Sequence, residues 1–276
     1  MAGAEKTYLI TGCASGLGHT IHMQLGGVGL RREMSLDDPL IAEQGPFDAI
    51  VHCAFNSAKH ITQESAFAYF DDNVLLTKRL TAIPHKKFIY ISTLDIYPRL
   101  GRPIQEDDPL DLSGLTGLYA ASKLFSEACV RELTKNHLIL RPSALLGTHM
   151  RANTTYRCLC EPHTQVFLSA DSRYNYVLNT DIAEFVANGI KEDLCGVFNL
   201  ASTGTVRLGD VAEALELDVR FGDHVYDIGP IDNRRAADVD HRFARESWQT
   251  LNLFVDQLGD RFCGTGRLTR PAQRAL

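Results

Sequence analysis

Short apolar runs alternate with longer segments of helical periodicity over the first two-thirds of the chain. The runs are rich in Ile, Val, Leu, Phe or Tyr, and they predict buried strands at 8–11, 49–53, 87–92 and 137–140. The segments between them predict amphipathic helices over 16–25, 65–82 and 118–136. Strands that alternate with helices in this way are typical of βαβ units that build a parallel sheet.

The pattern changes after Pro142, where a polar stretch rich in Asn, Thr, His and Ser follows. Regular periodicity returns further on and predicts elements over 181–190, 197–200 and 208–215. We therefore expect an α/β fold with a doubly wound parallel sheet over residues 1–148. A small α+β lobe is expected over 149–266, interleaved with the last core strands, and a tail over 267–276.

The composition is that of an ordinary globular protein, with 45% hydrophobic and 22% charged residues in a chain of 276. A net charge of −6 lacks the basic surface that nucleic-acid binding requires. No apolar run approaches the roughly 20 residues that span a bilayer, and the first residues lack a signal-peptide pattern. We expect a cytoplasmic protein with neither nucleic acid nor membrane as a partner.

The seven cysteines are odd in number and scattered, which favours reduced thiols over a disulfide framework. Cys158 and Cys160 form a CxC pair without a second pair at ligand spacing, and the ten histidines include no HExxH motif. No metal site is therefore expected.

A glycine-rich turn, Thr11-Gly-Cys-Ala-Ser-Gly-Leu-Gly18, directly follows the first predicted strand and opens the first predicted helix. Gly12 permits a tight turn, Gly16 lets the backbone approach a pyrophosphate, and Gly18 lets the helix pack closely on the strand. Amides at the helix start then point at the anion. The turn predicts a dinucleotide site with contacts from Gly12, Ser15, Gly16, Leu17 and Gly18, and the alternative is a plain turn.

A shorter second strand is predicted at 28–30, and no acidic residue follows it to bind the adenosine ribose. Arg31 and Arg32 stand there instead. Adjacent guanidinium groups favour a 2′-phosphate, and hence NADP over NAD. The alternative is that both arginines are solvated loop residues.

The segment Tyr119-Ala-Ala-Ser-Lys123 lies in a predicted helix, so its phenol and ammonium share one face. A nearby cation and a hydroxyl donor stabilise a phenolate and draw its pKa from about 10 toward the working range. Lys123 would supply that cation and also bond the nicotinamide ribose. By itself, this spacing also fits an ordinary surface pair.

The strand predicted at 87–92 ends at two successive hydroxyl residues, Ser92 and Thr93. Ligands bind at the carboxyl ends of parallel strands in open α/β sheets. A hydroxyl at this position, together with Tyr119, can polarise a substrate carbonyl. Without the glycine turn and the Tyr119–Lys123 pair, a turn cap would be the simpler interpretation.

Six motifs, taken in order, resemble the extended short-chain dehydrogenase/reductase family in its NAD-dependent epimerase/dehydratase branch. They cover most of the chain and are Val51-His-Cys-Ala54, Asp72-Asn73-Val74, Ser92-Thr-Leu-Asp-Ile-Tyr97 (family SSxxVY), Leu140-Arg-Pro-Ser-Ala-Leu-Leu-Gly147 (LRPxxVYG), Val177-Leu-Asn-Thr-Asp-Ile-Ala183 (VHVDDVA) and Gly196-Val-Phe-Asn-Leu200. The resemblance implies a Rossmann-type core, a homodimer and a catalytic set of Thr93, Tyr119 and Lys123. It adds cofactor contacts from Ala54, Phe55, Asn73, Pro142, Ser143 and Ala144.

Family dehydratases carry an Asp-Glu pair after the catalytic threonine, whereas Leu94 and Asp95 follow Thr93 here. The resemblance therefore implies an NAD(P)-dependent oxidoreductase or epimerase that acts on a sugar carbonyl or hydroxyl, with a nucleotide-linked sugar as the expected substrate. Family substrates bind between the core and the smaller lobe, which here implies contacts from Asp95, Met150, Arg151, Asn153 and Arg173.

Two alternatives remain open from the sequence. One is a non-catalytic dinucleotide sensor or scaffold, because a fold can keep a cofactor turn and lose turnover. The other is a reductase of a small non-sugar carbonyl compound.

Overall fold

The computed structural model describes residues 6–58, 60–115 and 117–269. The chain divides into two compact units, each made of three stretches. Unit 1 comprises Met1–Pro98, Pro109–Arg141 and Ile182–Phe198. Unit 2 comprises Arg99–Asp108, Pro142–Asp181 and Asn199–Leu276.

Unit 1 is built on a six-stranded sheet in the order β10-β5-β4-β3-β1-β2. Its strands are β1 (Tyr8–Thr11), β2 (Val28–Leu30), β3 (Phe47–His52), β4 (His85–Ile91), β5 (His137–Pro142) and β10 (Gly196–Leu200). β1 pairs in parallel with β2 on one side and with β3 on the other. The strand order therefore reverses direction between β1 and β3, and such a switch point is where open α/β sheets bind ligands.

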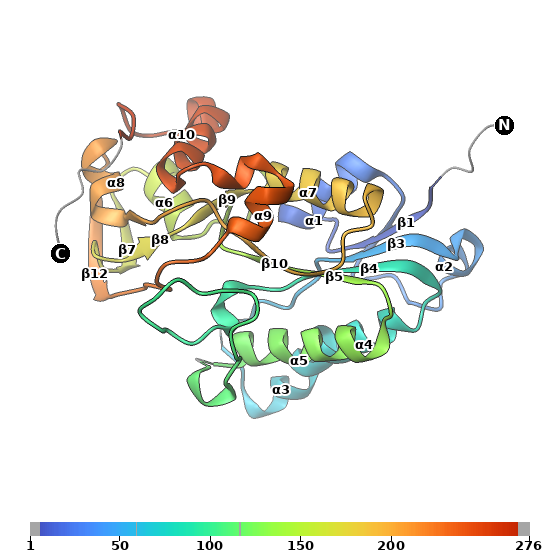
Figure 1. Ribbon diagram of the computed structural model, residues 1–276. Helices are drawn as coiled ribbons and strands as arrows, with labels where there is room; N and C mark the ends of the chain where they lie inside the picture. Colours follow the sequence, from blue (N-terminus) through green and yellow to red (C-terminus); the bar gives the residue numbers. More distant parts are fainter. Residues whose placement is uncertain (1–5, 59, 116, 270–276) are drawn as a thin grey trace. The chain divides into compact units, whose positions relative to one another are not determined.

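Helices cover both faces of this sheet (Figure 1). On one face lie α1 (Gly16–Leu25) and α7 (Asn179–Lys191), and on the other α3 (Gln63–Phe70), α4 (Leu76–Thr81) and α5 (Leu118–Leu133). The short α2 (Pro39–Gln44) precedes β3, and a π-helical turn, η1 (Asp71–Leu75), joins α3 to α4. Short 3₁₀ turns are η2 (Leu94–Ile96) and η3 (Leu112–Gly114). The sequence thus forms the doubly wound layers that its βαβ pattern predicts.

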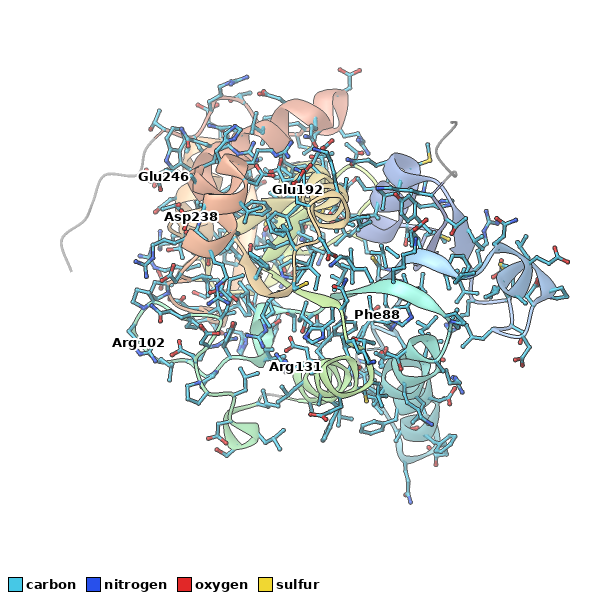
Figure 2. All side chains as sticks on the ribbon, turned by 45° about the vertical axis from the view of Figure 1, so that its right-hand side comes forward. Phe88, Arg102, Arg131, Glu192, Asp238 and Glu246 are labelled. Carbon is cyan, nitrogen blue, oxygen red and sulfur yellow. The ribbon has the colours of Figure 1, made fainter. Side chains whose placement is uncertain are left out.

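The core of unit 1 comes from apolar side chains of the central strands, including Leu9, Ile50, Phe88 and Ile139, with Val130 from α5. Phe88 lies in the interior of the sheet and is fully buried (Figure 2). Each such side chain stabilises the fold by about 1.5–3 kcal/mol.

A buried ion cluster joins β5 to α5. The Arg141 Nε donates to Glu127 Oε1 at 3.0 Å, and the second guanidinium nitrogen donates to Oε2 at 2.7 Å. Both side chains are essentially inaccessible to solvent. Arg131, one helical turn after Glu127, donates to the same carboxylate at 2.7 Å. The Arg141 guanidinium also bonds the hydroxyl of Tyr97 and lies 4.8 Å from the centre of that ring.

Unit 2 contains three two-stranded ladders. They pair β6 (Ala144–Leu146) with β9 (Tyr176–Leu178), β7 (Thr164–Leu168) with β12 (Val219–His224), and β8 (Arg173–Tyr174) with β11 (Val206–Arg207). Its helices are α6 (Thr154–Cys160), α8 (Leu208–Ala214), α9 (Arg234–Val239) and α10 (Ser247–Leu258), with 3₁₀ turns η4 (His241–Ala244) and η5 (Gly259–Arg261). These elements surround a second apolar core.

That core includes Leu146, Tyr176, Leu251 and Phe254. Trp248 of α10 packs against it, and its indole Nε1 is buried with no hydrogen-bond partner among the described residues. Trp248 is the single tryptophan of the chain.

Several predicted boundaries are wrong. The helix predicted over 65–82 is three elements, because η1 changes the hydrogen-bond pattern between α3 and α4. The helix predicted over 118–136 ends at Leu133, where Thr134 turns to an extended conformation and its hydroxyl bonds the Val130 carbonyl. β3 begins at Phe47, and Cys53 lies beyond it because its amide donates to the Thr11 hydroxyl. Residues 270–276 of the predicted tail lie outside the described residues.

Candidate active site

The glycine turn lies at the switch point of the sheet. Gly12 and Gly16 have φ of +71° and +61°, a backbone region that favours glycine. A Cβ on Gly12 would lie 2.9 Å from the Ala54 amide nitrogen, and one on Gly18 would lie 2.4 Å from the Gly12 carbonyl oxygen. Gly12 thus permits close approach of the loop after β3, and Gly18 lets α1 pack on the turn. A Cβ at Gly16 would meet no atom within 4 Å, so this part of the turn faces open space.

Thr11 fixes the loop after β3 to this turn. Its hydroxyl accepts hydrogen bonds from the amides of Cys53 (3.1 Å) and Ala54 (2.9 Å). Because both acceptor positions are then used, its proton goes to His52 Nδ1 at 2.7 Å. The turn and the loop are therefore held as one rigid structure.

His52 extends this network to η1, α4 and α5. Since Nδ1 accepts, Nε2 carries the ring proton and donates to the Thr77 hydroxyl at 3.0 Å. Thr77 and Ser126 in turn donate to the Asn73 carbonyl, each at 2.9 Å. Burial lowers the pKa of His52 to about 3, with a smaller contribution from the charge of Lys123, so the ring stays neutral at physiological pH.

Asn73 is buried and pairs with the backbone of Asn56, accepting from its amide at 2.7 Å and donating to its carbonyl at 3.2 Å. This side chain thus holds the far end of the loop that contains Ala54 and Phe55. Asn73 has therefore a structural role in the described residues, beside the cofactor contact that the resemblance implies.

Arg32 is bound to an acidic residue from another element. Its guanidinium donates to Asp72 at 2.6 Å, and the Asn56 side-chain amide donates to the same carboxylate oxygen at 2.9 Å. The Arg32 side chain is 81% exposed. Arg31 is exposed as well. The sequence predicts that the two guanidinium groups act together, but their contacts differ. Among the described residues, Asp72 binds Arg32 and does not bind Arg31.

Thr93 and Tyr119 lie close enough for the Thr93 hydroxyl to lower the pKa of the Tyr119 phenol. Thr93 follows β4 and caps η2, where its hydroxyl accepts from the Asp95 amide at 3.2 Å. Tyr119 lies in the first turn of α5 and is 39% exposed. The end of a central strand and the start of a helix thus bring together two hydroxyls that are 26 positions apart in sequence.

Lys123 lies one helical turn further along α5 and is almost fully buried. Its Nζ donates to the Ile91 carbonyl at 2.7 Å and lies 4.5 Å from the ring centre of Phe55 and 5.0 Å from that of Tyr90. Burial lowers the pKa of Lys123 to about 8, against smaller raising effects of Cys53 and Glu127. The amine can therefore gain or lose a proton close to neutral pH.

One electrostatic prediction is wrong. The sequence predicts that Lys123 draws the pKa of Tyr119 toward neutrality, but burial of the phenol group, in a residue that is 39% exposed as a whole, raises that pKa to about 12. The Thr93 hydrogen bond lowers it, while the charge of Asp95 raises it further. Because desolvation penalises a phenolate, Tyr119 is a protonated donor at neutral pH.

The predicted substrate residues of unit 2 have unequal surroundings. Met150 packs against the unit 2 core and its sulfur accepts from the Gly147 amide at 3.3 Å. Asn153 caps α6 through the Tyr156 amide and donates to the Leu145 carbonyl. Arg151 and Arg173 are exposed. Met150 and Asn153 therefore support the structure around them, and the two arginines face solvent.

Buried polar atoms without a hydrogen-bond partner mark further positions. Among the described residues they include the hydroxyls of Ser92 and Ser143 and both side-chain atoms of Asn179. A buried unpaired hydroxyl costs about 1–3 kcal/mol, so it is expected to be used by a ligand or water. The family motif predicts a role for Ser143. The sequence favours Thr93 over Ser92 and gives no role to Asn179, although Asn179 stands where the motif VHVDDVA has an apolar valine.

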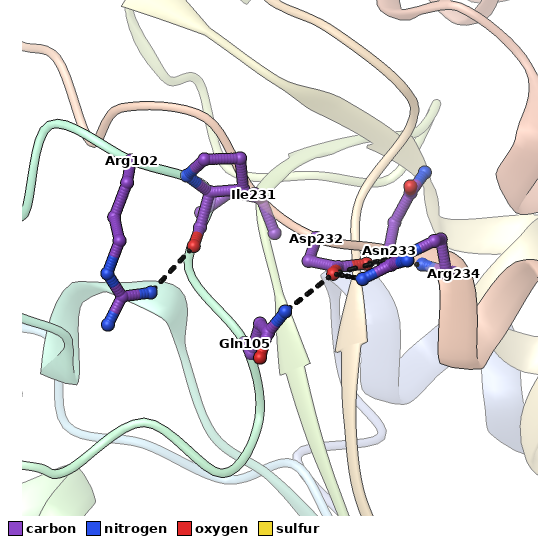
Figure 3. Close-up of a pocket in the computed structure, with 7 residues that line it drawn as sticks. Arg102, Gln105, Ile231, Asp232, Asn233 and Arg234 are labelled. Atoms are coloured by element: carbon purple, nitrogen blue, oxygen red, sulfur yellow. Dashed lines mark hydrogen bonds and ion pairs between the residues drawn. The ribbon is translucent and has the colours of Figure 1, made fainter.

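A separate cavity of about 450 Å³ lies within unit 2 (Figure 3). Its lining includes Arg102, Gln105, Asp232 and Arg234, and the last two are joined by an ion pair at 2.5 Å. The Gln105 amide also donates to Asp232, at 3.2 Å. Asp232 and Arg234 are therefore engaged with each other, whereas Arg102 pairs with Asp108, at 2.6 Å.

Within residues 6–58, 60–115 and 117–269, no helix has the length and apolarity needed to cross a membrane. In the same part of the chain, no group of three or more His, Cys, Asp or Glu side chains is arranged to hold a metal ion. The seven cysteines carry free thiols.

The sheet order, the glycine turn at its switch point and the flanking helices define a Rossmann-type α/β protein. The model of the NAD dependent epimerase/dehydratase family matches residues 16–186, well over half of the chain. The protein therefore belongs to this family.

Solved structures share the fold. A dTDP-4-dehydrorhamnose reductase of Clostridium acetobutylicum is 20% identical with a TM-score of 0.73, over 92% of this chain and 99% of that one. Another from Bacillus anthracis, in complex with NADP, is 15% identical with a TM-score of 0.74, over 92% and 98%. UDP-glucuronic acid 4-epimerase of Bacillus cereus, in complex with UDP-glucuronic acid and NAD, is 17% identical with a TM-score of 0.67, over 91% and 99%. A comparison with curated protein sequences gave no significant match.

Proposed function

We propose that this protein is an NAD(P)-dependent reductase or epimerase that acts on a sugar carbonyl or hydroxyl, with a nucleotide-linked sugar as substrate. The observation that carries the proposal is that Thr93, at the end of β4, lies beside Tyr119 of α5, with Lys123 buried one helical turn further along the same helix. The named reductases and the epimerase act on nucleotide sugars, which supports this substrate class.

Each member of this set has a distinct task. Tyr119, protonated at neutral pH, donates its proton to the substrate oxygen during reduction, and Thr93 orients that oxygen. Lys123 bonds the nicotinamide ribose. When bound, the nicotinamide supplies the electron pair exchanged with the substrate carbon.

The glycine turn fits a dinucleotide. Open space at Gly16 and the start of α1, with Ser15, Leu17 and Gly18, suit a pyrophosphate. The unpartnered Ser143 hydroxyl suits a polar group such as the nicotinamide amide, flanked by Pro142 and Ala144. For the adenosine end, Arg31 is the candidate for a 2′-phosphate, because Arg32 is engaged by Asp72. NADP thus remains slightly favoured.

Dehydration is the less favoured chemistry, because Leu94 follows Thr93 and supplies no acid for the loss of water. Asp95 remains in place to contact a sugar hydroxyl. Arg151 and Arg173, both exposed, are the proposed contacts for a diphosphate, and Met150 and Asn153 shape the segment that carries Arg151.

The test combines binding and turnover. Titration with NADH and NADPH, followed by nicotinamide fluorescence, should show binding of at least one cofactor. Tyr119→Phe should reduce kcat by about 10²–10⁴-fold and leave cofactor affinity nearly unchanged, because it removes only the proton donor. Tyr156→Phe in unit 2 is the matched control and should leave both unchanged. Full turnover in Tyr119→Phe would remove this mechanism, and cofactor binding without turnover on any keto-sugar would favour a sensor or scaffold.

We further propose a homodimer in the cytoplasm. Leu118, Phe125 and Leu133 are exposed along α5 and form an apolar stripe that a second copy would cover. Seven free thiols suit a reducing compartment. Sedimentation equilibrium of the purified protein tests the dimer, and a monomer at micromolar concentration would contradict it.

A further inference from the structure

Phe55 occupies a particular place among the proposed catalytic residues. Its ring centre lies 4.5 Å from Lys123 Nζ and 5.0 Å from the Tyr119 ring centre, and the Phe55 and Tyr119 rings are nearly perpendicular. A third contact, at 6.0 Å, joins it to Tyr69 of α3. The ring therefore touches both the ammonium and the phenol side chain of the site.

The three N–H groups of Lys123 have limited directions available. One donates to the Ile91 carbonyl at 2.7 Å. Aromatic ring faces, those of Phe55 and Tyr90, cover two further sides of the ammonium. A ligand hydroxyl can bond to Nζ only if one of these rings moves.

Phe55 is the ring that can move. Tyr90 is fixed within β4, which pairs with β3 and β5, and it is fully buried. Phe55 lies in the loop after β3, outside any helix or strand, and is partly exposed. The loop backbone is held on both sides of it, at Ala54 by Thr11 and at Asn56 by Asn73. Rotation of the side chain is therefore the available motion, with the backbone as a fixed pivot.

We propose that Phe55 is a gate over Lys123, which must swing aside before the ribose of the cofactor can bond the amine. This inference rests on the proposed function and deepens it, because it makes cofactor binding depend on one side-chain rotation. The same rotation removes the Phe55 contact from the Tyr119 ring. Cofactor affinity is then reduced by the fraction of molecules in which the gate is open.

The first readout needs no cofactor. The rate at which an amine-acetylating reagent labels Lys123, measured by peptide mass spectrometry and divided by the fraction of neutral amine obtained from its pH dependence, reports how often Nζ is uncovered. Phe55→Ala should raise this rate about fivefold to tenfold, the range expected when a cation–π contact is lost. Phe55→Leu keeps apolar volume without the ring face and should give a smaller rise. The control is Phe67→Ala, which removes an exposed aromatic ring of α3 and should leave the rate unchanged.

The second readout is the association of NADH and NADPH, measured by stopped-flow nicotinamide fluorescence. Phe55→Ala should bind more tightly than wild type, by the same factor as the rise in labelling and mainly through faster association. Unchanged labelling would show that Phe55 does not cover Lys123 and would overturn the proposal. Raised labelling with unchanged or weaker binding would also overturn it, because Phe55 would then be a wall of the site. If neither wild type nor variant bound a cofactor, the proposed function would fail, and the labelling rates would still decide whether Phe55 shields Lys123.

Discussion

Arg141 and Lys123 are both buried cations of unit 1, but their surroundings differ in charge. Arg141 forms two hydrogen bonds to the carboxylate of Glu127. Lys123 has no carboxylate within ion-pair distance among the described residues, and its contacts are a carbonyl oxygen and two ring faces. Burial alone would lower the pKa of Arg141, yet Glu127 outweighs it and the pKa is raised. For Lys123 burial prevails, and the pKa falls to about 8.

This difference distinguishes a buried charge that stabilises the fold from one that can take part in a reaction. A buried cation that is fully paired keeps its proton at any accessible pH and fixes the packing of β5 against α5. A buried cation without a carboxylate partner weakens the fold, but its proton can move near neutrality. The Arg141 cluster therefore stabilises the packing of β5 against α5. Lys123 is available for proton exchange at the candidate active site.

The largest expected change in the free energy of unfolding comes from breaking the ion pair between Glu127 and Arg141. Glu127→Gln leaves the buried charge of Arg141 without its carboxylate, and should lower the free energy of unfolding by about 3–5 kcal/mol in urea titrations. Arg131→Gln, which removes only the half-exposed partner, should cost less than about 1 kcal/mol. The double variant Glu127→Gln/Arg141→Met should recover part of the loss. If Glu127→Gln cost no more than Arg131→Gln, the cluster would not stabilise the fold.

A smaller change in the free energy of unfolding, this time a gain, is expected when Lys123 is replaced. Its pKa of about 8 in the folded protein, against 10.5 as the model value, means that the unfolded chain binds more protons between these pH values. Stability of the wild type should therefore rise from pH 8 to pH 10.5. Lys123→Met removes the penalty and should gain about 1–3 kcal/mol at pH 7, while turnover is lost.

The measurement is urea unfolding of both proteins at pH 7 and pH 10. The advantage of Lys123→Met should shrink at pH 10, because the wild-type amine is then neutral in the folded state. A variant that is less stable than wild type at pH 7 would show that the contacts of Lys123 outweigh its desolvation.

The smallest expected effect is on the pKa of Tyr119, and it comes from removing the charge of Asp95. The charge of Asp95 raises the pKa of Tyr119, after burial as the main cause. Asp95→Asn should therefore move the pH dependence of kcat/KM to lower pH by about half a pH unit. This shift corresponds to less than about 1 kcal/mol. Asp107→Asn in unit 2 serves as the control. A shift to higher pH would mean that Asp95 acts on Tyr119 through structure rather than charge.

Much of the unit 1 fold was predictable, because its strands are buried on both faces and show as continuous apolar runs. β1, β2 and α1 have the predicted bounds. For unit 2 the sequence predicts a small α+β lobe but not its ladders, because these consist of strands of two to six residues with little periodicity. The assignment of Arg99–Asp108 to unit 2 depends on contacts such as Ile104 with Ile231, which no local pattern reveals.

At the candidate site, the sequence spacing of residues predicts which side chains come together when they share a helix or lie at the end of a strand. Tyr119 and Lys123 are one helical turn apart, and Thr93 ends an obvious strand, so these three were found together. The pKa of Tyr119 was not predictable, because it depends on burial. Nor could the sequence indicate that His52 links the glycine turn to η1, or that Phe55 covers Lys123, since both depend on side chains from three or more elements.

The position of Trp248 gives the molecule a built-in optical label. Because it is the only indole in the chain and packs on the unit 2 core, ultraviolet excitation at the red edge of indole absorption reports on unit 2 alone. Unit 1 holds no tryptophan, so its unfolding contributes no emission at this excitation wavelength. The unfolding of unit 2 can therefore be followed by itself, in the whole chain and without any added dye.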